Sequence, residues 1–343
     1  MIAVNRPAAA LLALAAVAGA GCSADFAPQY RVTDLRILAI RSVVVGTESN
    51  PSTTADGDPP DVLRLWALVA NPQARPGLTV TWRACVPTGT DALVPCLDPE
   101  ALRDPASLDG RPGVIALGQG ASVDVSLARP DVEAALTELV KRAESDPSVA
   151  CHLYVELPVV VVAEAGGRLE SALKTVRIAP VREAAGTSVA GDYLLNTNPG
   201  IARIDTDPAD ADACTGGAPI VDVCLSACGA GTCQPDPEGG LSQCTPPPGT
   251  LAAGSHVVCG LVDANAIQTY PRCDAANAFY AVDETLAWQW YLTDGTIEKT
   301  GMVGNATGDH VTLTPPAGPF TLWVVLRDVR GGVSWVQRDF PAP

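Results

Sequence analysis

Short runs in which apolar and polar residues alternate, with turn-forming residues between them, recur along the chain and constrain its fold most strongly. Apolar residues hold every second position in Leu78–Val86, and Leu286–Leu292 repeats the alternation just before the pair Asp294-Gly295. A strand with one buried face has this period of two, and an Asp-Gly pair is typical of a tight hairpin. Many short strands joined by turns predict an all-β chain that folds as β-sandwiches.

One amphipathic helix is predicted at residues 130–144. Pro130 suits a first helical turn, and the carboxylates of Asp131 and Glu133 suit the positive end of the helix dipole. Apolar residues follow at helical spacing. We expect this helix to pack as a crossover on a sheet edge; the alternative is a helix that binds a partner.

Changes in composition divide the chain into a signal segment, a tether and two domains. A length of 343 residues is enough for two ordinary cores. The predicted divisions are a lipoprotein signal peptide at 1–21, a tether at 22–30, an N-terminal β-sandwich domain at 31–180, a linker at 181–191 and a C-terminal β-domain at 192–343 with a Cys-rich insert at 205–249. The insert has too few large apolar residues for a core, so we expect disulfides to hold it.

The start of the chain has the pattern of an export signal that ends at a lipid attachment site. Arg6 supplies a positive charge, and residues 8–20 form an apolar core too short to span a bilayer. Cys22 follows small residues and can carry diacylglycerol on its sulfur, which anchors the chain. Gly19 stands where such sites usually carry leucine, so ordinary cleavage that leaves a plain thiol is the alternative. Ser23 stands where an aspartate would favour the inner membrane, so we expect the outer membrane of a bacterial cell envelope.

The number of cysteines also indicates export, because disulfides form in oxidising compartments. The chain has 11 cysteines, and an even number remains for disulfides if Cys22 carries lipid. The best local pair is Cys85–Cys96, which a short proline-containing loop separates. If all the others pair, at least one bond joins the two halves of the chain. The disulfide candidates are Cys85, Cys96, Cys151, Cys214, Cys224, Cys228, Cys233, Cys244, Cys259 and Cys273.

Zinc is an alternative for part of the cysteine-rich insert. Structural zinc sites favour more closely spaced cysteine pairs, and an oxidising compartment favours disulfides. The insert could also act as a rigid knob that binds another protein. The cysteines concerned are Cys224, Cys228, Cys233 and Cys244.

The formal net charge of −16 argues against nucleic acid and anionic lipid as partners, because both would be repelled. Divalent cations fit this charge better, and calcium prefers several oxygen ligands on a flexible loop. The EF-hand spacing is absent and Pro208 interrupts the loop, so a solvated acidic loop is the alternative. The candidate calcium ligands are Asp205, Asp207, Asp210 and Asp212, and no other cofactor is predicted.

No catalytic residue is predicted. Gly186–Ala190 approaches the G-x-S-x-G motif around Ser188, but it ends in alanine and lies in the predicted linker without the required strand–turn–helix. The three histidines each lie in or beside a predicted strand, and they are His152, His256 and His310. An extracellular hydrolase is therefore the third of the functions considered.

Tryptophans raise the question of sugar binding, because exposed aromatic rings can stack on sugars. Trp323 alternates with Leu322, so at least one aromatic ring could face outward. Core packing is the favoured interpretation, because sandwich cores use tryptophan heavily, and a sugar-binding platform is the alternative. The 6 tryptophans are Trp66, Trp82, Trp288, Trp290, Trp323 and Trp335.

Two parts of the chain resemble known families. The stretch with Trp288-Gln289-Trp290, residues 321–330, Gly331-Gly332 and Trp335 resembles PKD-type and related immunoglobulin-like domains of bacterial surface proteins. The N-terminal part is similar to uncharacterised lipoproteins of myxobacteria; the similar residues are 32–41, 65–72, 80–85 and Asn196-Thr197-Asn198-Pro199. These resemblances imply two immunoglobulin-like sandwiches at the cell surface, with no catalytic residue.

We therefore expect a lipid-anchored envelope or surface protein that acts as a non-enzymatic binding or structural module. The alternative is a carbohydrate- or calcium-dependent adhesion protein. The expected partners are the membrane, through the lipid anchor, and an envelope protein or glycan.

Overall fold

The computed structural model describes residues 28–44, 49–50, 62–86, 96, 101, 104–145, 155–178, 196–209, 214, 217–223, 233–234, 243–244, 251–263, 266–273, 279–298, 303–304 and 308–342. These residues form antiparallel β-sheets and the helix α3 (Pro130–Ser145). Among them, no helix combines the length and the apolar character needed to cross a membrane.

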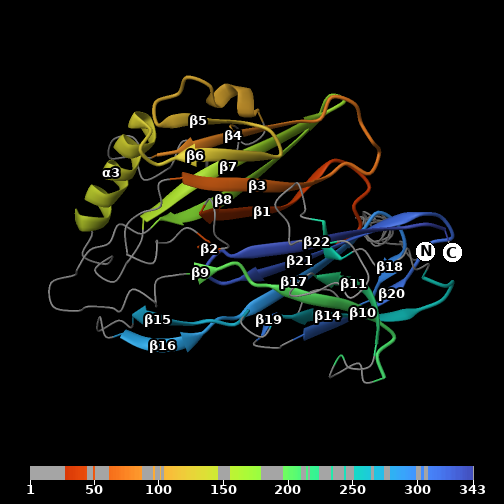
Figure 1. Ribbon diagram of the computed structural model, residues 1–343. Helices are drawn as coiled ribbons and strands as arrows, with labels where there is room; N and C mark the ends of the chain where they lie inside the picture. Colours follow the sequence, from red (N-terminus) through yellow and green to blue (C-terminus); the bar gives the residue numbers. More distant parts are fainter. Residues whose placement is uncertain are drawn as a thin grey trace, which may run out of the picture.

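The first sandwich consists of two facing sheets. One sheet has the strand order β1-β3-β6 and the other β5-β4-β7-β8 (Figure 1). All neighbouring strands in both sheets pair antiparallel. The strands are β1 (Arg36–Val44), β3 (Val62–Ala70), β4 (Thr79–Cys85), β5 (Val114–Gln119), β6 (Ser122–Ser126), β7 (Val155–Ala165) and β8 (Arg168–Ile178).

The second sandwich is built in the same way. One sheet contains the neighbours β10-β14-β20, and the facing sheet has the order β19-β17-β21-β22. The strands are β10 (Ile201–Thr206), β14 (His256–Val262), β17 (Leu286–Leu292), β19 (Val303–Gly304), β20 (Gly308–Thr314), β21 (Phe320–Asp328) and β22 (Val333–Phe340).

The two sandwiches share one topology. In each, the first, second and fifth of these strands form one sheet, and the fourth, third, sixth and seventh form the other. Two antiparallel sheets of this kind, seven strands in all, define the immunoglobulin-like sandwich. The expectation of an all-β chain with two immunoglobulin-like sandwiches and one amphipathic helix is therefore confirmed.

Short strands extend this common plan. The larger sheet of the second sandwich continues beyond β10 into β11, β13 and β12, and beyond β20 into β18, while β15 pairs with β16 and β2 with β9. Their bounds are β2 (Ser49–Asn50), β9 (Asn196–Thr197), β11 (Ala218–Val223), β12 (Cys233–Gln234), β13 (Gln243–Cys244), β15 (Thr269–Cys273), β16 (Phe279–Asp283) and β18 (Thr296–Ile297).

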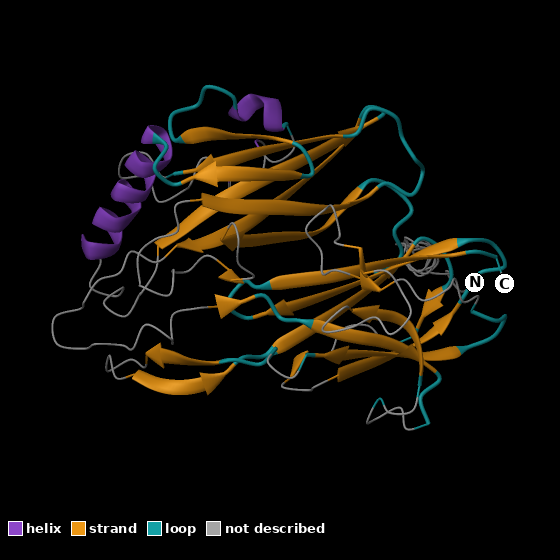
Figure 2. Ribbon diagram, viewed as in Figure 1, coloured by secondary structure: helices purple, strands orange, loops and turns teal. Residues whose placement is uncertain are grey.

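In Figures 1 and 2 the first sandwich lies above the second, and β1 lies next to β22. The core of each sandwich fills the space between its own two sheets. A third apolar cluster lies between the sandwiches, where the β1-β3 face of the first meets the β21-β22 face of the second. Its buried residues are Val32, Leu38, Ala39, Val43, Trp66, Leu68, Ala70, Trp323, Val325, Val333 and Trp335.

The side-chain period of a strand explains this arrangement. On β3, Leu63 and Leu65 enter the first core, whereas Trp66 and Leu68 on the opposite face enter the layer between the sandwiches. On β21, Leu322 and Val324 likewise fill the second core while Trp323 and Val325 face the first sandwich. A sheet that is covered on both faces needs near-continuous apolar strands, and both sequences supply them.

Helix α3 follows β6 and precedes β7 along the chain, and it packs against the first sandwich, so the expected crossover is confirmed. The helix ends one residue after the predicted end. Val132 and Ala135 are buried in the first core, and Leu136, Leu139 and Val140 pack against it. The helix covers one end of this sandwich in Figure 2.

Two disulfides are present in the described part of the chain. The predicted pair Cys85–Cys96 is confirmed, with Cα atoms 5.8 Å apart, and Cys214–Cys259 is the second, with Cα atoms 5.7 Å apart. Cys151, Cys224 and Cys228 lie outside the described residues. Cys233, Cys244 and Cys273 lie in strands β12, β13 and β15, and Cys233 stands opposite Cys244 in the strand register.

Two details bear on the sequence-based expectations. All six tryptophans are buried, because Trp323 faces the other sandwich rather than solvent; they pack in apolar layers, as favoured from the sequence, and none forms an exposed platform for sugars. Tyr30, placed at the end of the tether, packs against the second core. The backbone on either side of Arg31 pairs with Leu292 of β17. The predicted linker at 181–191 lies outside the described residues.

The close approach of the two sheets in the second core yields a first prediction. A Cβ atom on Gly260 of β14 would lie 2.5 Å from the ring of Trp288. We expect Gly260→Ala to lower the free energy of unfolding by about 1–3 kcal/mol, because the buried ring has to move. Gly318→Ala is the matched control, since nothing lies within 4 Å of its added Cβ. Urea unfolding of both variants measures the difference, and equal stabilities would contradict this packing.

Candidate functional site at the junction of the sandwiches

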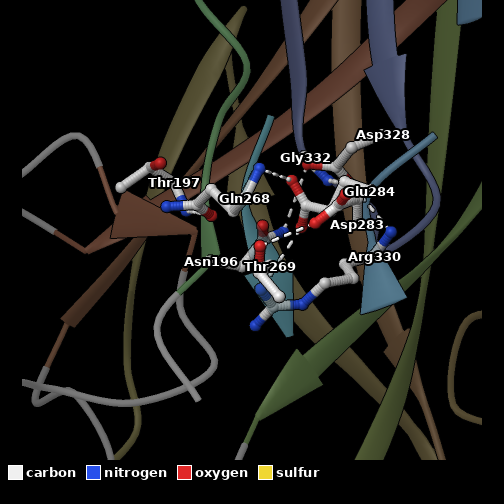
Figure 3. Close-up of polar contacts among 9 residues, drawn as sticks. All are labelled: Asn196, Thr197, Gln268, Thr269, Asp283, Glu284, Asp328, Arg330 and Gly332. Atoms are coloured by element: carbon white, nitrogen blue, oxygen red, sulfur yellow. Dashed lines mark hydrogen bonds and ion pairs between the residues drawn. The ribbon is translucent and has the colours of Figure 1, made fainter. Parts of the chain in front are cut away.

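The turn between β21 and β22 is held by one carboxylate. Asp328 Oδ1 accepts hydrogen bonds from the backbone N–H of Arg330 and of Gly332, each at 2.7 Å. Gly331 has a φ of 96°, which favours glycine, and a Cβ on Gly332 would collide with Asp328. The pair Gly331-Gly332 therefore lets the turn close tightly around the Asp328 side chain (Figure 3).

A second carboxylate lies beside this turn. Glu284, which follows β16, is fully buried, and its Oε1 lies 3.2 Å from Nη1 of Arg330. Its Oε2 accepts a hydrogen bond from the backbone N–H of Gln268 at 3.4 Å. The guanidinium of Arg330 also lies 5.2 Å from the ring centre of Tyr270, within cation–π range. Arg330 thus ties the turn to the base of the β15-β16 hairpin.

The stretch Asn196-Thr197-Asn198 connects these parts to the first sandwich. Asn196 Nδ2 donates to Asp328 Oδ2 at 3.3 Å. Asn198 Nδ2 donates to the backbone carbonyl of Ser42 on β1 at 3.2 Å, while its Oδ1 accepts from Val333 N at 2.8 Å. The amide side chain of Asn198 therefore bridges β1 and β22. The stretch Asn196-Thr197-Asn198, noted in the sequence analysis, thus has a structural role.

Two cations complete the junction. Lys174 Nζ on β8 donates to the backbone carbonyl of Gly331 at 2.6 Å. Arg327 on β21 donates from Nη2 to the carbonyl of Leu38 at 2.7 Å and from Nε to Gln289 at 2.8 Å. The β1–β3 register shifts between Ile37 and Ala39, so Arg327 binds β1 at an irregular position in its ladder.

Burial shifts the acid–base properties of these groups. Burial raises the pKa of Glu284 to about 7, with a further rise from Asp328 that Arg330 partly offsets. Burial also raises the pKa of Asp328. For Lys174, burial followed by repulsion from Arg327 lowers the pKa to about 8. The junction can therefore exchange protons near neutral pH while it holds the two sandwiches together.

The structure does not bring the predicted calcium ligands to one point among the residues it describes. Asp205 is buried on β10, with Oδ2 2.7 Å from Nη2 of Arg203. Asp207 instead lies 2.7 Å from Nδ1 of His256. Asp210 and Asp212 lie outside the described residues, within which no group of three or more histidine, cysteine, aspartate or glutamate side chains is placed to hold a metal. Calcium binding stays a prediction.

The predicted lipidation site and the residues considered for a hydrolase are not tested. Cys22 and Ser188 lie outside the described residues, as does His152, and His310 lies on β20. The residues that do converge, above all Glu284 and Arg330, were not predicted as a site. Their one sequence signal is the turn at residues 328–332, which marks a loop but not what packs on it.

Comparisons with known proteins do not assign the chain to a family. No family model matches the chain, and no curated protein matches it. The D00-D0 domain of Intimin matches with 9% identity and a TM-score of 0.20, covering 89% of this chain and 99% of that one. The Escherichia coli alpha-2-macroglobulin activated by porcine elastase matches with 11% identity and a TM-score of 0.18, covering 92% of this chain and 22% of that one. TM-scores this low support no conclusion, so the fold assignment rests on the strand order.

The raised pKa of Glu284 makes a second prediction. The folded state retains the Glu284 proton more tightly than the unfolded state, so its stabilising contribution is present at low pH and is lost as pH rises through about 7. We compare the free energy of unfolding of the native chain with that of Glu284→Gln at each pH. We expect the native chain to lose up to roughly 3 kcal/mol relative to the variant between about pH 4 and pH 8.

Denaturant unfolding across this pH range measures that change. Glu298→Gln is the control, because Glu298 is an exposed glutamate of the same sandwich. A difference between the native chain and Glu284→Gln that stays constant with pH would contradict the assignment.

Proposed function

We propose that the chain is a lipid-anchored cell-envelope protein that works as a non-enzymatic binding or structural module. The observation that carries this proposal is the buried layer joining the two sandwiches. Domains with ordinary polar interfaces move relative to each other, whereas a large apolar interface suppresses that motion. The layer here buries four aromatic or aliphatic side chains of the β21-β22 face, namely Trp323, Val325, Val333 and Trp335.

A rigid body of this kind suits the presentation of a surface. Many enzymes close a lid or a pair of domains over the substrate and so need a hinge. Here Asn198, Lys174 and Arg327 cross the junction by hydrogen bonds. These contacts oppose hinge motion and support a binding or structural role.

The anchor would lie close to this body. The described chain begins at Pro28, and Tyr30 and Val32 already bond to the backbone of Leu292 at 2.9 and 2.7 Å. The six residue-to-residue steps from Cys22 to Pro28 span at most on the order of 20 Å. In this proposal the second sandwich therefore stands within that distance of the membrane surface.

The test of the anchor is a pair of substitutions in cells. We expect Cys22→Ser to move the chain from the membrane fraction to the soluble fraction, because the sulfur that carries the lipid is lost. Ser23→Ala is the matched control and should stay in the membrane fraction. Ser23→Asp should shift the chain toward the inner membrane. Retention of Cys22→Ser in the membrane fraction would refute the lipid anchor. An intact mass of the native chain without diacylglycerol would do the same.

A calcium-dependent adhesion protein is the second candidate, and Asp207 favours it because it extends from the end of β10 with its side chain largely exposed. We expect this candidate to show a melting temperature that rises with calcium in the native chain and not in Asp207→Asn. The same temperature with calcium and with chelator would remove it. Turnover that Ser188→Ala abolishes would favour the hydrolase over both.

A further inference from the structure

A small cavity lies where the edges of the first sandwich meet the second. Its volume is about 150 Å³. Strands β1 and β8 supply most of its wall, and β21 supplies the rest. The lining residues are Ile37, Leu38, Ala39, Ile40, Ala172, Leu173, Lys174 and Arg327.

Two of these residues are cations, and none of the described lining residues carries a carboxylate. The hydrogen bonds already described give Lys174 and Arg327 neutral acceptors, namely backbone carbonyls and the Gln289 amide. Arg177 adds a further positive charge near Lys174, while Asp328 offsets part of it. The cavity is thus locally positive in a chain whose net charge is −16.

Like charges in a half-buried site are unfavourable unless a negative charge joins them. Lys174 also has N–H donors beyond the one that Gly331 accepts, because an ammonium has three. An anion in the cavity would accept these donors and neutralise the repulsion from Arg327. The positive cavity therefore favours an anionic ligand.

We propose that this cavity binds a carboxylate on a short aliphatic stem, with its oxygens at Lys174 and Arg327 and its stem against Ala172 and Leu173. The side chains that line it are apolar except for the two cations, which matches a group with one charged end. Pockets for drug-sized ligands are about 300–1,000 Å³, so this smaller cavity suits a short acid or a glutamate side chain. This ligand class rests on the binding role proposed above.

The site has a consequence for the whole fold. A carboxylate held here would contact β8 of the first sandwich and β21 of the second at once. A ligand that binds only the assembled form stabilises it, so binding would strengthen the joint between the sandwiches. It would also favour the charged form of Lys174, so affinity should fall as pH rises above about 8.

The composition of the chain makes Lys174 easy to observe. Lys141, Lys174 and Lys299 are its only lysines, so lysine labelled with ¹³C and ¹⁵N gives three side-chain signals. The mature chain is purified in a nonionic detergent and titrated with butyrate at constant ionic strength. Acetate and inorganic phosphate serve as comparison anions. The signal that disappears in Lys174→Met is assigned to Lys174. Lys141→Met is the control for this assignment, because Lys141 lies on the exposed face of α3.

We expect butyrate to move the Lys174 signal saturably and to leave the Lys141 and Lys299 signals in place. Butyrate should bind more tightly than acetate, which lacks the stem, and about thirtyfold more weakly at pH 9.5 than at pH 7. Ala172→Leu, which keeps both cations but fills the cavity, should abolish the response. N-acetylglutamate α-amide distinguishes a peptide side chain from a free acid as the source of the carboxylate.

No saturable shift of Lys174 with either carboxylate, or equal shifts of all three lysines, would overturn the site. An unchanged response in Ala172→Leu would do the same. Because the signal comes from the folded body, this result is independent of the anchor: a chain released by Cys22→Ser should bind butyrate as the anchored chain does.

Discussion

The apolar layer between β1-β3 and β21-β22 is the constraint on which the rest of the structure depends. Trp66 and Leu68 on one side, with Trp323 and Val325 on the other, would face water if either sandwich stood alone. Burial of such side chains stabilises a fold by about 1.5–3 kcal/mol each, so the pairing of sandwiches belongs to the fold itself. Two immunoglobulin-like units thereby become one body with four layers.

The polar contacts around Asp328 give that apolar contact one geometry. Apolar faces can slide, whereas Asn198 and Lys174 can reach their backbone partners in one relative position. Lys174 does this although its charge is costly to bury, and its lowered pKa follows from that cost. Position and proton binding are therefore properties of the same residue.

The sequence predicts the elements better than the contacts between them. The alternation in Leu286–Leu292, the helix at 130–144 and the pair Cys85–Cys96 all depend on neighbours in sequence, and the structure has each of them. The sequence does not decide what the Trp323 side chain faces, because a strand that is buried on both sides is apolar throughout and does not indicate which sheet covers each face. The junction could not be predicted, since Glu284 meets Arg330, and Asn196 meets Asp328, only through the packing of distant segments.

A contact between two sandwiches of the same topology could in principle form again between separate molecules. The contact joins two different faces of similar units, and such head-to-tail contacts can repeat without limit between molecules. In the described part of the chain, each sandwich has one disulfide on the sheet that takes no part in this contact, on the face that points away from the core. Cys85–Cys96 holds residues such as Leu108 over Val160 of β7, and Cys214–Cys259 covers the outer side of β14. The sheet faces that point away from the contact therefore carry buried disulfides.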